Sequence, residues 1–317
     1  MNICLIIPVY KGESTIAKTL DSLLLQSVNF SELIIINDGS PDNSEKIILE
    51  YIKGKKIKKC RLITHKKPVG LAATYNEGIK LADSELVVTL HQDVVLFRNS
   101  LKILIRPFER NNSKIVASYH LVLHPIKVWK KYNFWQKVFF SRLVGKKFYG
   151  LDGKFDCFRK SALKRIGLFD QKHFRTASED GEIIFRLRKI GRLEKTEAKI
   201  VHLHQVNDNF CLNDIIKKQG QYSEAQGVML RRGVIRSPKQ IVSAFFREFL
   251  LLLLLLPHLY IIGILLIMIY TFYYTKTVYL YEYKNPRILI LPFINIFLLF
   301  VSFYFSLRGI IRGKQSV

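Results

Sequence analysis

The stretch ELIIINDGSPDNSEKIILEYIKG, residues 32–54, decides the fold. It opens with a short apolar run that stops at Asn37 and Asp38. Apolar runs of this length, bounded by turn residues, are typical of buried strands. Ser44 closes the turn and is well placed to cap a helix over residues 45–54. The stretch therefore predicts a strand, a polar turn and a helix in succession.

The same alternation extends through the first 110 residues. We expect further strands at residues 2–7, 60–65 and 85–90, and helices at residues 15–27 and 70–83. Strands separated by helices of this length predict right-handed βαβ units and a mostly parallel sheet. The predicted fold class is α/β.

Two aspartates directly follow predicted strands, Asp38 and Asp93. In open parallel sheets, ligands bind at the carboxyl ends of the strands. Either aspartate alone is compatible with a simple turn, but two at one edge favour a site. Neither GxGxxG nor GxxxxGK[ST] occurs, which argues against the usual dinucleotide and P-loop sites.

The composition narrows the choice of partners. The chain has 317 residues, with 50 Lys and Arg against 25 Asp and Glu, a formal net charge of +25. Such an excess points to nucleic acid, an anionic membrane face or phosphorylated substrates, unless it reflects a general bias toward lysine. The four cysteines form no CxxC pair, so a zinc ribbon is not expected. We expect them to be reduced thiols in a cytosolic compartment. The start, MNICLIIPVY, is expected to be a strand rather than a signal peptide.

Two long apolar runs break the globular pattern near the C-terminus. Each is long enough to cross a bilayer, although Pro257 leaves open that the first run re-enters, and a pair of buried core helices is the alternative. Flanking Lys and Arg place the large N-terminal part and the C-terminus in the cytoplasm by the positive-inside rule, as a multi-pass membrane protein. We expect a basic linker, a first transmembrane helix, a short outward loop, a second transmembrane helix and a basic tail, over residues 231–244, 245–275, 276–287, 288–307 and 308–317.

Residues 120–149 form a basic, aromatic insert. At helical spacing one face carries apolar and aromatic residues, and another carries lysines. Such a helix is suited to an anionic membrane surface. The alternatives are a helix packed on its domain by the aromatic face, and a nucleic-acid site. We expect no nucleic acid, because membrane spans accompany the insert. The two faces comprise Val128, Tyr132, Trp135, Phe139 and Leu143, and Lys127, Lys130, Lys131 and Lys137.

Five blocks, in order, resemble the family 2 glycosyltransferases, which have the GT-A nucleotide-sugar-binding fold. The resemblance covers roughly residues 3–205, so the expected catalytic domain is residues 1–230. It implies a nucleotide-sugar donor, Mn²⁺ or Mg²⁺, and inversion at the anomeric carbon. The blocks are IPVYKGESTIAKTLDSLLLQS with LIIINDGSPDNS, GLAATYNEGIKLAD, HQD, GLDGKFDCFRKSALKRIGLFD and SEDGEIIFRLRKIG.

The resemblance implies a nucleotide pocket near the first strands. Asp38 corresponds to the family aspartate that binds the nucleobase, and a carboxylate can accept a hydrogen bond from a base N–H. Lys67 and the helix that begins near Gly70 would lie beside the diphosphate. The first block would line the base pocket through Pro8, Val9, Tyr10 and Glu13.

The HQD step takes the place of the family DxD motif. His91 replaces the first aspartate, and Asp93 is retained as the expected metal ligand. One carboxylate with a substrate diphosphate suits Mg²⁺ or Mn²⁺. In a strand, His202 and His204 would point to the same side and offer further ligands. Each histidine is equally compatible with a structural role.

The resemblance also assigns catalytic carboxylates. Asp180 would be the general base that takes a proton from the acceptor hydroxyl, and Glu179 would orient the site. The same pair would favour the N-terminus of a helix without catalysis. Asp152 would lie on the acceptor side, although its DG step is also a turn signal.

We expect a membrane-anchored, inverting, non-processive glycosyltransferase with a lipid-linked or glycan acceptor, favouring a polyprenyl-diphosphate-linked glycan. The QxxRW motif of processive synthases is missing, since Gln221 stands without a following Arg-Trp pair. One alternative is transfer to a polyprenyl phosphate. The other is a non-catalytic, nucleotide-sugar-binding membrane module.

Overall fold

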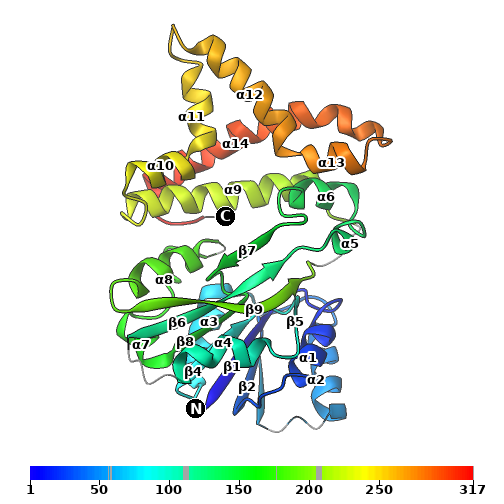
Figure 1. Ribbon diagram of the computed structural model, residues 1–317, viewed down its shortest axis with the longest axis vertical. Coiled ribbons are helices and arrows are strands. Elements are labelled where there is room, and N and C mark those ends of the chain that lie inside the picture. Colours follow the sequence, from blue (N-terminus) through cyan, green and yellow to red (C-terminus); the bar gives the residue numbers. More distant parts are fainter. Residues whose placement is uncertain (56, 58, 110–113, 176, 205–208, 317) are drawn as a thin grey trace. The chain divides into compact units, whose positions relative to one another are not determined.

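Strand β1 (Ile3–Val9) is buried along its whole length in the computed structural model of the chain (Figure 1). The structure describes residues 1–55, 57, 59–109, 114–175, 177–204 and 209–316. The chain divides into two compact units, here called the sheet unit and the helical unit. The sheet unit comprises Met1–Pro125, Gly145–Gln171 and Glu179–Val206, and the helical unit Ile126–Val144, Lys172–Ser178 and Asn207–Val317.

In the part of the chain that the structure describes, the sheet has nine strands, in the order β3-β2-β1-β4-β8-β6-β9-β5, with β7 paired to β6. β1 to β4 are parallel, as predicted. β8 runs antiparallel to β4 and begins a mixed half that the sequence did not predict. The other strands are β2 (Glu32–Asn37), β3 (Cys60–Thr64), β4 (Leu86–Leu90), β5 (Val94–Leu96), β6 (Ile115–Leu123), β7 (Lys147–Gly150), β8 (Phe155–Arg159) and β9 (Arg192–His202).

Helices cover both faces of this sheet. Successive side chains of β1 point to opposite faces. Leu5 belongs to the core that includes side chains of α1, α2 and α4, and Ile6 to the core that includes α3, α7 and α8. A strand buried on both faces needs a continuous apolar run, which the first strand has. The helices of this unit are α1 (Ile16–Leu24), α2 (Ser44–Lys55), α3 (Leu71–Leu81), α4 (Ser100–Glu109), α7 (Lys160–Arg165) and α8 (Glu179–Leu187).

The helical unit is built around two long helices, α9 and α14, which pack against each other. α9 is rich in polar residues, whereas α14 is apolar. The elements of the helical unit are α5 (Ile126–Trp129), α6 (Phe134–Phe140), α9 (Leu212–Arg231), α10 (Pro238–Ala244), α11 (Phe246–Leu253), α12 (Tyr260–Tyr274), α13 (Lys276–Tyr281), the 3₁₀ helix η1 (Pro286–Ile290) and α14 (Leu291–Arg312).

The continuous amphipathic helix expected within residues 120–149 is not formed. β6 extends to Leu123, and the helical part is two short helices, α5 and α6. Asn133 interrupts it, because its side chain accepts the amide of Gln136 and caps α6. Trp129 and Tyr132 are buried in an apolar cluster of the helical unit. The aromatic face therefore packs on its own domain, which was the alternative prediction.

The first predicted transmembrane helix is also interrupted. Residues 245–275 contain α11 and α12, and the chain turns between them at residues 254–259. Pro257 lies in this turn, where its missing N–H cannot continue a helical ladder. Within the described part of the chain, one helix is long and apolar enough to cross a membrane, Pro286–Arg312. The expectation of two full-length spans is therefore wrong for this structure.

Glycines allow α9 and α14 to approach closely. A Cβ on Gly309 would meet the backbone of Glu224, and a Cβ on Gly227 would meet the backbone of Ser306. Because the obstacle is backbone rather than a movable side chain, the two helix axes would have to separate. The packing of these helices depends on both positions having no side chain.

We expect Gly309→Ala to lower the melting temperature of the detergent-solubilised protein by several degrees, because overpacking costs about 1–3 kcal/mol. Thermal unfolding followed by circular dichroism measures this. Gly54→Ala in α2 is the matched control, since nothing lies within 4 Å of its Cβ. It should leave the melting temperature unchanged or raise it. Equal behaviour of the two variants would contradict the close approach.

Candidate active site

Asp38 lies at the carboxyl end of β2, with its backbone amide bonded to the carbonyl of Val9 at 2.8 Å. Its carboxylate accepts the amides of Val69 and Gly70 at 2.8 and 2.9 Å, and faces Nδ1 of His65 at 2.7 Å. A carboxylate has about four acceptor positions, so these three bonds leave room for one more donor. The carboxylate is thus fixed by the turn that precedes α3.

His65, which the sequence did not single out, bridges two carboxylates. Its Nε2 lies 2.7 Å from Glu77, opposite the contact with Asp38. Burial lowers the pKa of the imidazole, but the two carboxylates outweigh burial and raise it. His65 directly follows β3, so the strand-end argument that selected Asp38 could have found it. The chain Asp38–His65–Glu77 ties β2 and β3 to α3.

The loop after β1 is held against the HQD step by Gln92. Its side chain accepts the amide of Tyr10 at 2.9 Å and donates to the carbonyl of Tyr10 at 2.7 Å. Glu13 in the same loop accepts from the amide of Asn43, after β2. Gln92 therefore positions the first block directly beside Asp93. The sequence analysis included Gln92 only as the middle residue of the HQD step and predicted no role for it.

The other residues expected at the nucleotide differ in exposure. Pro8 and Val9 are buried in β1 and present only backbone, whereas Tyr10 is exposed. Lys67 is exposed beside the turn that precedes α3. Gly70 has φ +99°, a conformation that favours glycine, and it immediately precedes α3. The amide of Gly70 already donates to Asp38 and is not available to a diphosphate. Of the two residues expected beside the diphosphate, Lys67 is therefore the one that can contact it.

His91, Asp93 and His202 form a group suited to a metal ion, with one potential ligand atom from each lying within 4.8 Å of the others. Nε2 of His202 lies 3.1 Å from a carboxylate oxygen of Asp93. Within the described part of the chain, the other Asp93 oxygen and Nε2 of His91 are buried without hydrogen-bond partners. Buried polar atoms normally have partners, so this donor set fits a divalent cation.

The protonation of these groups also suits a cation. Burial, the largest influence, lowers the pKa of His91 to about 4, so the ring is neutral at pH 7 and has a free lone pair. Burial favours the neutral form of Asp93, but the imidazoles around it, His202 first, outweigh burial and hold its pKa well below the usual range. The group therefore offers an anionic oxygen from Asp93 and a neutral nitrogen from His91.

Two further histidines surround this group. His204 lies beyond the end of β9 and therefore not in the expected strand, but its ring lies beside that of His202, with ring centroids 3.7 Å apart. His124, which the sequence did not single out, stacks on His204 at 6.0 Å. His204 has φ +46°, an unusual conformation for a residue with a Cβ. Burial is the main cause that lowers the pKa of His124 to about 4 and the pKa of His204 well below 6.5. The cation site is thus embedded in neutral imidazoles.

Asp152 ends a chain of buried polar groups that the sequence did not predict. Asp156 accepts the amides of Asp152 and Gly153 at 2.9 and 2.6 Å, and it faces Nδ1 of His120 at 3.0 Å. Nε2 of His120 lies 3.5 Å from Asp152. His120 and Asp156 are fully buried, so their polar atoms contact Asp152 and each other instead of solvent. Burial raises the pKa of Asp152, but the ion pair with Lys154 at 2.6 Å and the nearby histidines together outweigh burial and lower the pKa to about 2.

Glu179 and Asp180 begin α8, as the sequence predicted for a carboxylate pair at a helix N-terminus. Burial first, and then the charge of Asp180, raise the pKa of Glu179 to about 8. Burial first, and then the charge of Asp152, raise the pKa of Asp180 to about 6, although the amide of Gly181 donates to it at 2.7 Å. At pH 7, Glu179 is mostly protonated and Asp180 mostly ionised.

Tyr75 connects these groups from α3. Its fully buried hydroxyl donates to the carbonyl of Gly153 at 2.9 Å, and its ring stacks near His91 at 6.4 Å. Burial first, and then four surrounding carboxylates, raise the pKa of Tyr75 well above 10. These carboxylates are Glu179, Asp156, Asp152 and Asp93. Three residues expected at the site, Asp93, Asp152 and Glu179, therefore act on one phenol.

Part of the sequence is similar to known proteins. The sequence profile of glycosyl transferase family 2 matches residues 4–167. The poly-β-1,6-N-acetyl-D-glucosamine synthase of Staphylococcus epidermidis is 30% identical over 175 residues, 53% of this chain and 42% of that protein. The UDP-Glc:α-D-GlcNAc-diphosphoundecaprenol β-1,3-glucosyltransferase WfgD of Escherichia coli is 25% identical over 142 residues, 45% of this chain and 54% of WfgD. The chain thus matches about half the length of these relatives.

Solved structures share the fold. A mannosyltransferase from Pyrobaculum calidifontis, in complex with GDP-Man and Mn²⁺, superposes with a TM-score of 0.61 at 13% identity. The match covers 99% of this chain and 88% of that one. GalNAc-T7, solved with UDP, GalNAc and Mn²⁺, superposes with a TM-score of 0.53 at 14% identity over 72% of this chain and 51% of that one. At these identities, the comparison establishes the fold alone.

We expect the protein to bind Mn²⁺ more tightly than Mg²⁺, because imidazole nitrogens suit transition metals better than Mg²⁺. Asp93→Ala should weaken Mn²⁺ binding by roughly 100-fold or more, while His91→Asp should shift the preference toward Mg²⁺. Titration calorimetry with each metal measures both effects. His258→Gln, far along the chain in the helical unit, is the control. Unchanged Mn²⁺ binding in Asp93→Ala would exclude this site.

Proposed function

Since the chain belongs to glycosyl transferase family 2, we propose that it is an inverting, non-processive glycosyltransferase. It transfers one sugar from a nucleotide-sugar donor to a membrane-associated acceptor. The observation that carries the proposal is the cluster around Tyr75, where an ionised Asp93, a charged Asp152 and the raised-pKa Glu179, the neighbour of Asp180 in α8, act on one phenol. Groups whose environments drive their pKa values apart are typical of acid–base sites.

The donor nucleotide is assigned to the edge formed by β1, β2 and β3. Asp38 has one acceptor position left for a base N–H, and its bonds to Val69 and Gly70 fix the direction of that position. Tyr10 is exposed in the adjoining loop, which Gln92 holds in place. Lys67 supplies a mobile positive charge for the diphosphate.

The reaction needs a base and a way to stabilise the leaving group. Asp180 takes the proton of the acceptor hydroxyl as its oxygen attacks the anomeric carbon, since a carboxyl with a pKa near 6 is ionised yet basic at neutral pH. Glu179, mostly protonated, keeps a second negative charge away from this base. His91, Asp93 and His202 would hold a Mn²⁺ or Mg²⁺ ion, which when bound neutralises the departing nucleoside diphosphate.

The acceptor is a glycan on a polyprenyl diphosphate in this proposal. The name of WfgD describes such an acceptor, and that relative aligns with 45% of this chain. A membrane-associated helical unit would keep the enzyme near a lipid-linked substrate. Transfer is non-processive, because the sequence has no Arg-Trp pair after Gln221.

We expect Asp180→Asn to lower kcat by about 10²–10⁴-fold without weakening nucleotide binding. For the wild type, kcat should fall about tenfold per pH unit below pH 6 and level off above it, since the base must lose its proton. Radiolabelled sugar transfer measures the rate, and calorimetry measures the binding. Asp83→Asn, an exposed carboxylate of the sheet unit, is the control.

Other outcomes would redirect the proposal. An active Asp180→Asn variant with no acid limb would indicate an already ionised acceptor, a polyprenyl phosphate. The product would then be an alkali-labile lipid-phosphate sugar. Tight nucleotide-sugar binding by the wild type without turnover on any acceptor would indicate a non-catalytic module.

His120 is expected to act as a positioning residue for Asp152. In His120→Asn, the shorter amide retains the bond to Asp156 and loses the reach to Asp152, so kcat should fall roughly tenfold to a hundredfold. The acceptor KM should rise, while the donor KM and the melting temperature should change little. His120→Ala, which also removes the Asp156 bond, should in addition lower the melting temperature. Equal kinetics for His120→Asn and wild type would leave His120 a purely structural residue.

A further inference from the structure

The α11–α12 hairpin is too short for either arm to cross a bilayer. α11 has 8 residues and α12 has 15. At about 1.5 Å per residue they are about 12 and 22 Å long, against a hydrocarbon core of about 30 Å. Half a bilayer with its headgroups measures about 20–22 Å, which matches α12. The hairpin therefore has the length to enter one leaflet and turn back.

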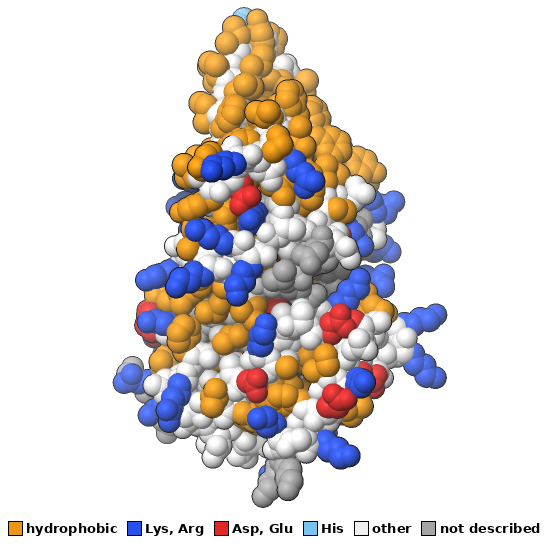
Figure 2. Space-filling model, turned by 90° about the vertical axis from the view of Figure 1, so that its right-hand side faces the viewer, with side chains coloured by type: hydrophobic (Ala, Val, Ile, Leu, Met, Phe, Trp, Pro, Cys, Tyr) orange, Lys and Arg blue, Asp and Glu red, His pale blue; other side chains and the backbone are white. Residues whose placement is uncertain are grey.

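The surface of this hairpin is apolar almost all round. Figure 2 shows this end of the chain as mostly orange, with blue basic side chains below it. Leu255, beside Pro257 in the turn, is 76% exposed. An exposed apolar surface of this kind marks an interaction site. The exposed side chains include Leu252, Leu255, Leu256, Leu259, Ile261, Ile262, Ile264, Leu265, Met268, Ile269 and Phe272.

Both arms of the hairpin stand on α14. Near the start of α11, Glu248 accepts the hydroxyls of Ser302 and Ser306 at 2.7 Å each. At the end of α12, the amide of Asn295 donates to the carbonyl of Thr271 at 2.6 Å and to the hydroxyl of Thr275 at 3.1 Å. Asn295 and Ser302 are about 10 Å apart along a helix. α14 therefore runs across the feet of the hairpin.

A second face of α14 is committed to α9. The hydroxyls of Ser302 and Ser223 lie 2.9 Å apart, and Arg231 donates to the carbonyl of Ile310 at 2.9 Å. Gly309 lies against the backbone of Glu224, which also pairs with Arg308 at 3.1 Å. α9 carries exposed charges such as Lys217. α14 cannot enter the hydrocarbon core as a spanning helix without taking this charged helix with it.

The remaining face of α14 is an apolar stripe along its whole length. The exposed residues recur at the spacing of one helical face. A helix with one apolar stripe, one polar face and basic residues at its C-terminal end is suited to lie in the membrane interface. The stripe consists of Phe293, Phe297, Phe300, Tyr304, Leu307 and Ile311.

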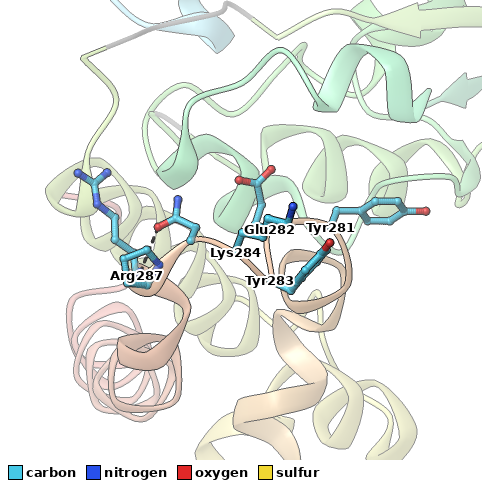
Figure 3. Close-up of a pocket in the computed structure, with 7 residues that line it drawn as sticks. Tyr281, Glu282, Tyr283, Lys284 and Arg287 are labelled. Atoms are coloured by element: carbon cyan, nitrogen blue, oxygen red, sulfur yellow. Dashed lines mark hydrogen bonds between the residues drawn. The ribbon is translucent and has the colours of Figure 1, made fainter.

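Basic and tyrosine side chains surround the feet of the hairpin. Arg142 lies 4.4 Å from the ring of Tyr274, and Lys276 lies 4.5 Å from the ring of Tyr273. Residues 231–317 contain eleven Lys and Arg against two acidic residues, a charge that complements anionic lipid. A shallow pocket lined by the end of α13, the following loop and the start of η1 contributes tyrosines, which are suited to headgroup depth. Figure 3 shows Tyr281, Glu282, Tyr283, Lys284 and Arg287 around it.

We propose that the helical unit is a monotopic anchor for an anionic membrane leaflet. The α11–α12 hairpin enters one leaflet, α14 lies in the interface with its apolar stripe toward lipid, and no described segment crosses. The loop over residues 276–287 then lies on the same side as the sheet unit, not on the opposite side as the hydropathy pattern predicts. This inference rests on the membrane association in the proposed function and specifies its geometry.

Cysteine labelling in sealed vesicles tests the topology. In a background of Cys60→Ser and Cys211→Ser, the remaining Cys4 and Cys157 are buried. Lys284→Cys should react with a membrane-impermeant maleimide only from the side on which Lys80→Cys, in the sheet unit, reacts. His258→Cys at the hairpin turn should react from neither side until detergent is added. Reaction of Lys284→Cys or His258→Cys from the side opposite to Lys80→Cys would overturn the proposal.

Flotation separates this proposal from the proposed function. The full-length protein should float with vesicles of phosphatidylglycerol and phosphatidylethanolamine. Leu255→Asp combined with Ile261→Asp, both exposed, should reduce binding roughly 50-fold or more. Leu49→Asp, exposed on α2, should not. A wild type that instead fails to float and forms dimers, with the double variant monomeric, would show that the hairpin binds a second copy of the chain. That result would contradict membrane association in both proposals.

Discussion

The contact between Asp93 and His202 joins the two halves of the sheet at the site. Asp93 follows β4 in the parallel half, and His202 ends β9 in the mixed half, yet their side chains meet at 3.1 Å. The antiparallel pairing of Val94 with His202 and the bond from the amide of Leu203 to the carbonyl of Asp93 fix this meeting. A slip of one residue in that pairing would turn His202 to the other face. The metal-suited group therefore depends on the register of the three-residue strand β5.

The site stores unfavourable electrostatics that the apolar sheet must offset. Glu179 and Asp156 are buried carboxyls whose pKa values are raised by burial. Buried polar groups are tolerated where hydrogen bonds satisfy them, and Asp156 has two amides and an imidazole. Asp93 retains an unpaired oxygen beside buried histidines, within the residues that the structure describes. Asp156 therefore has a structural role, since its hydrogen bonds are satisfied within the protein. Asp93 has an oxygen that is available to bind a ligand.

The sequence predicted what local pattern determines. Apolar runs and turn residues located β1 to β4, and the order of the blocks selected Asp38, Asp93 and the α8 pair. It missed Tyr75, His120 and Gln92, because their partners come from other elements far along the chain. Hydropathy also misjudged residues 245–275, since an average over a window does not register a reversal at Pro257. Residues 205–208 follow His204 and lie outside the residues that the structure describes.

The proposed anchor and the proposed chemistry constrain each other. A processive synthase that exports its polymer must provide a path across the bilayer, and a hairpin confined to one leaflet with an interfacial α14 provides none. A single transfer to a lipid-linked acceptor needs only access to one leaflet. The buried polar ladder of Glu248, Ser302 and Ser223 then has a physical role, since it holds an apolar helix to a charged one at the boundary of lipid and water. An all-apolar contact would leave α14 free to sink into the hydrocarbon, whereas these hydrogen bonds fix the depth of the anchor.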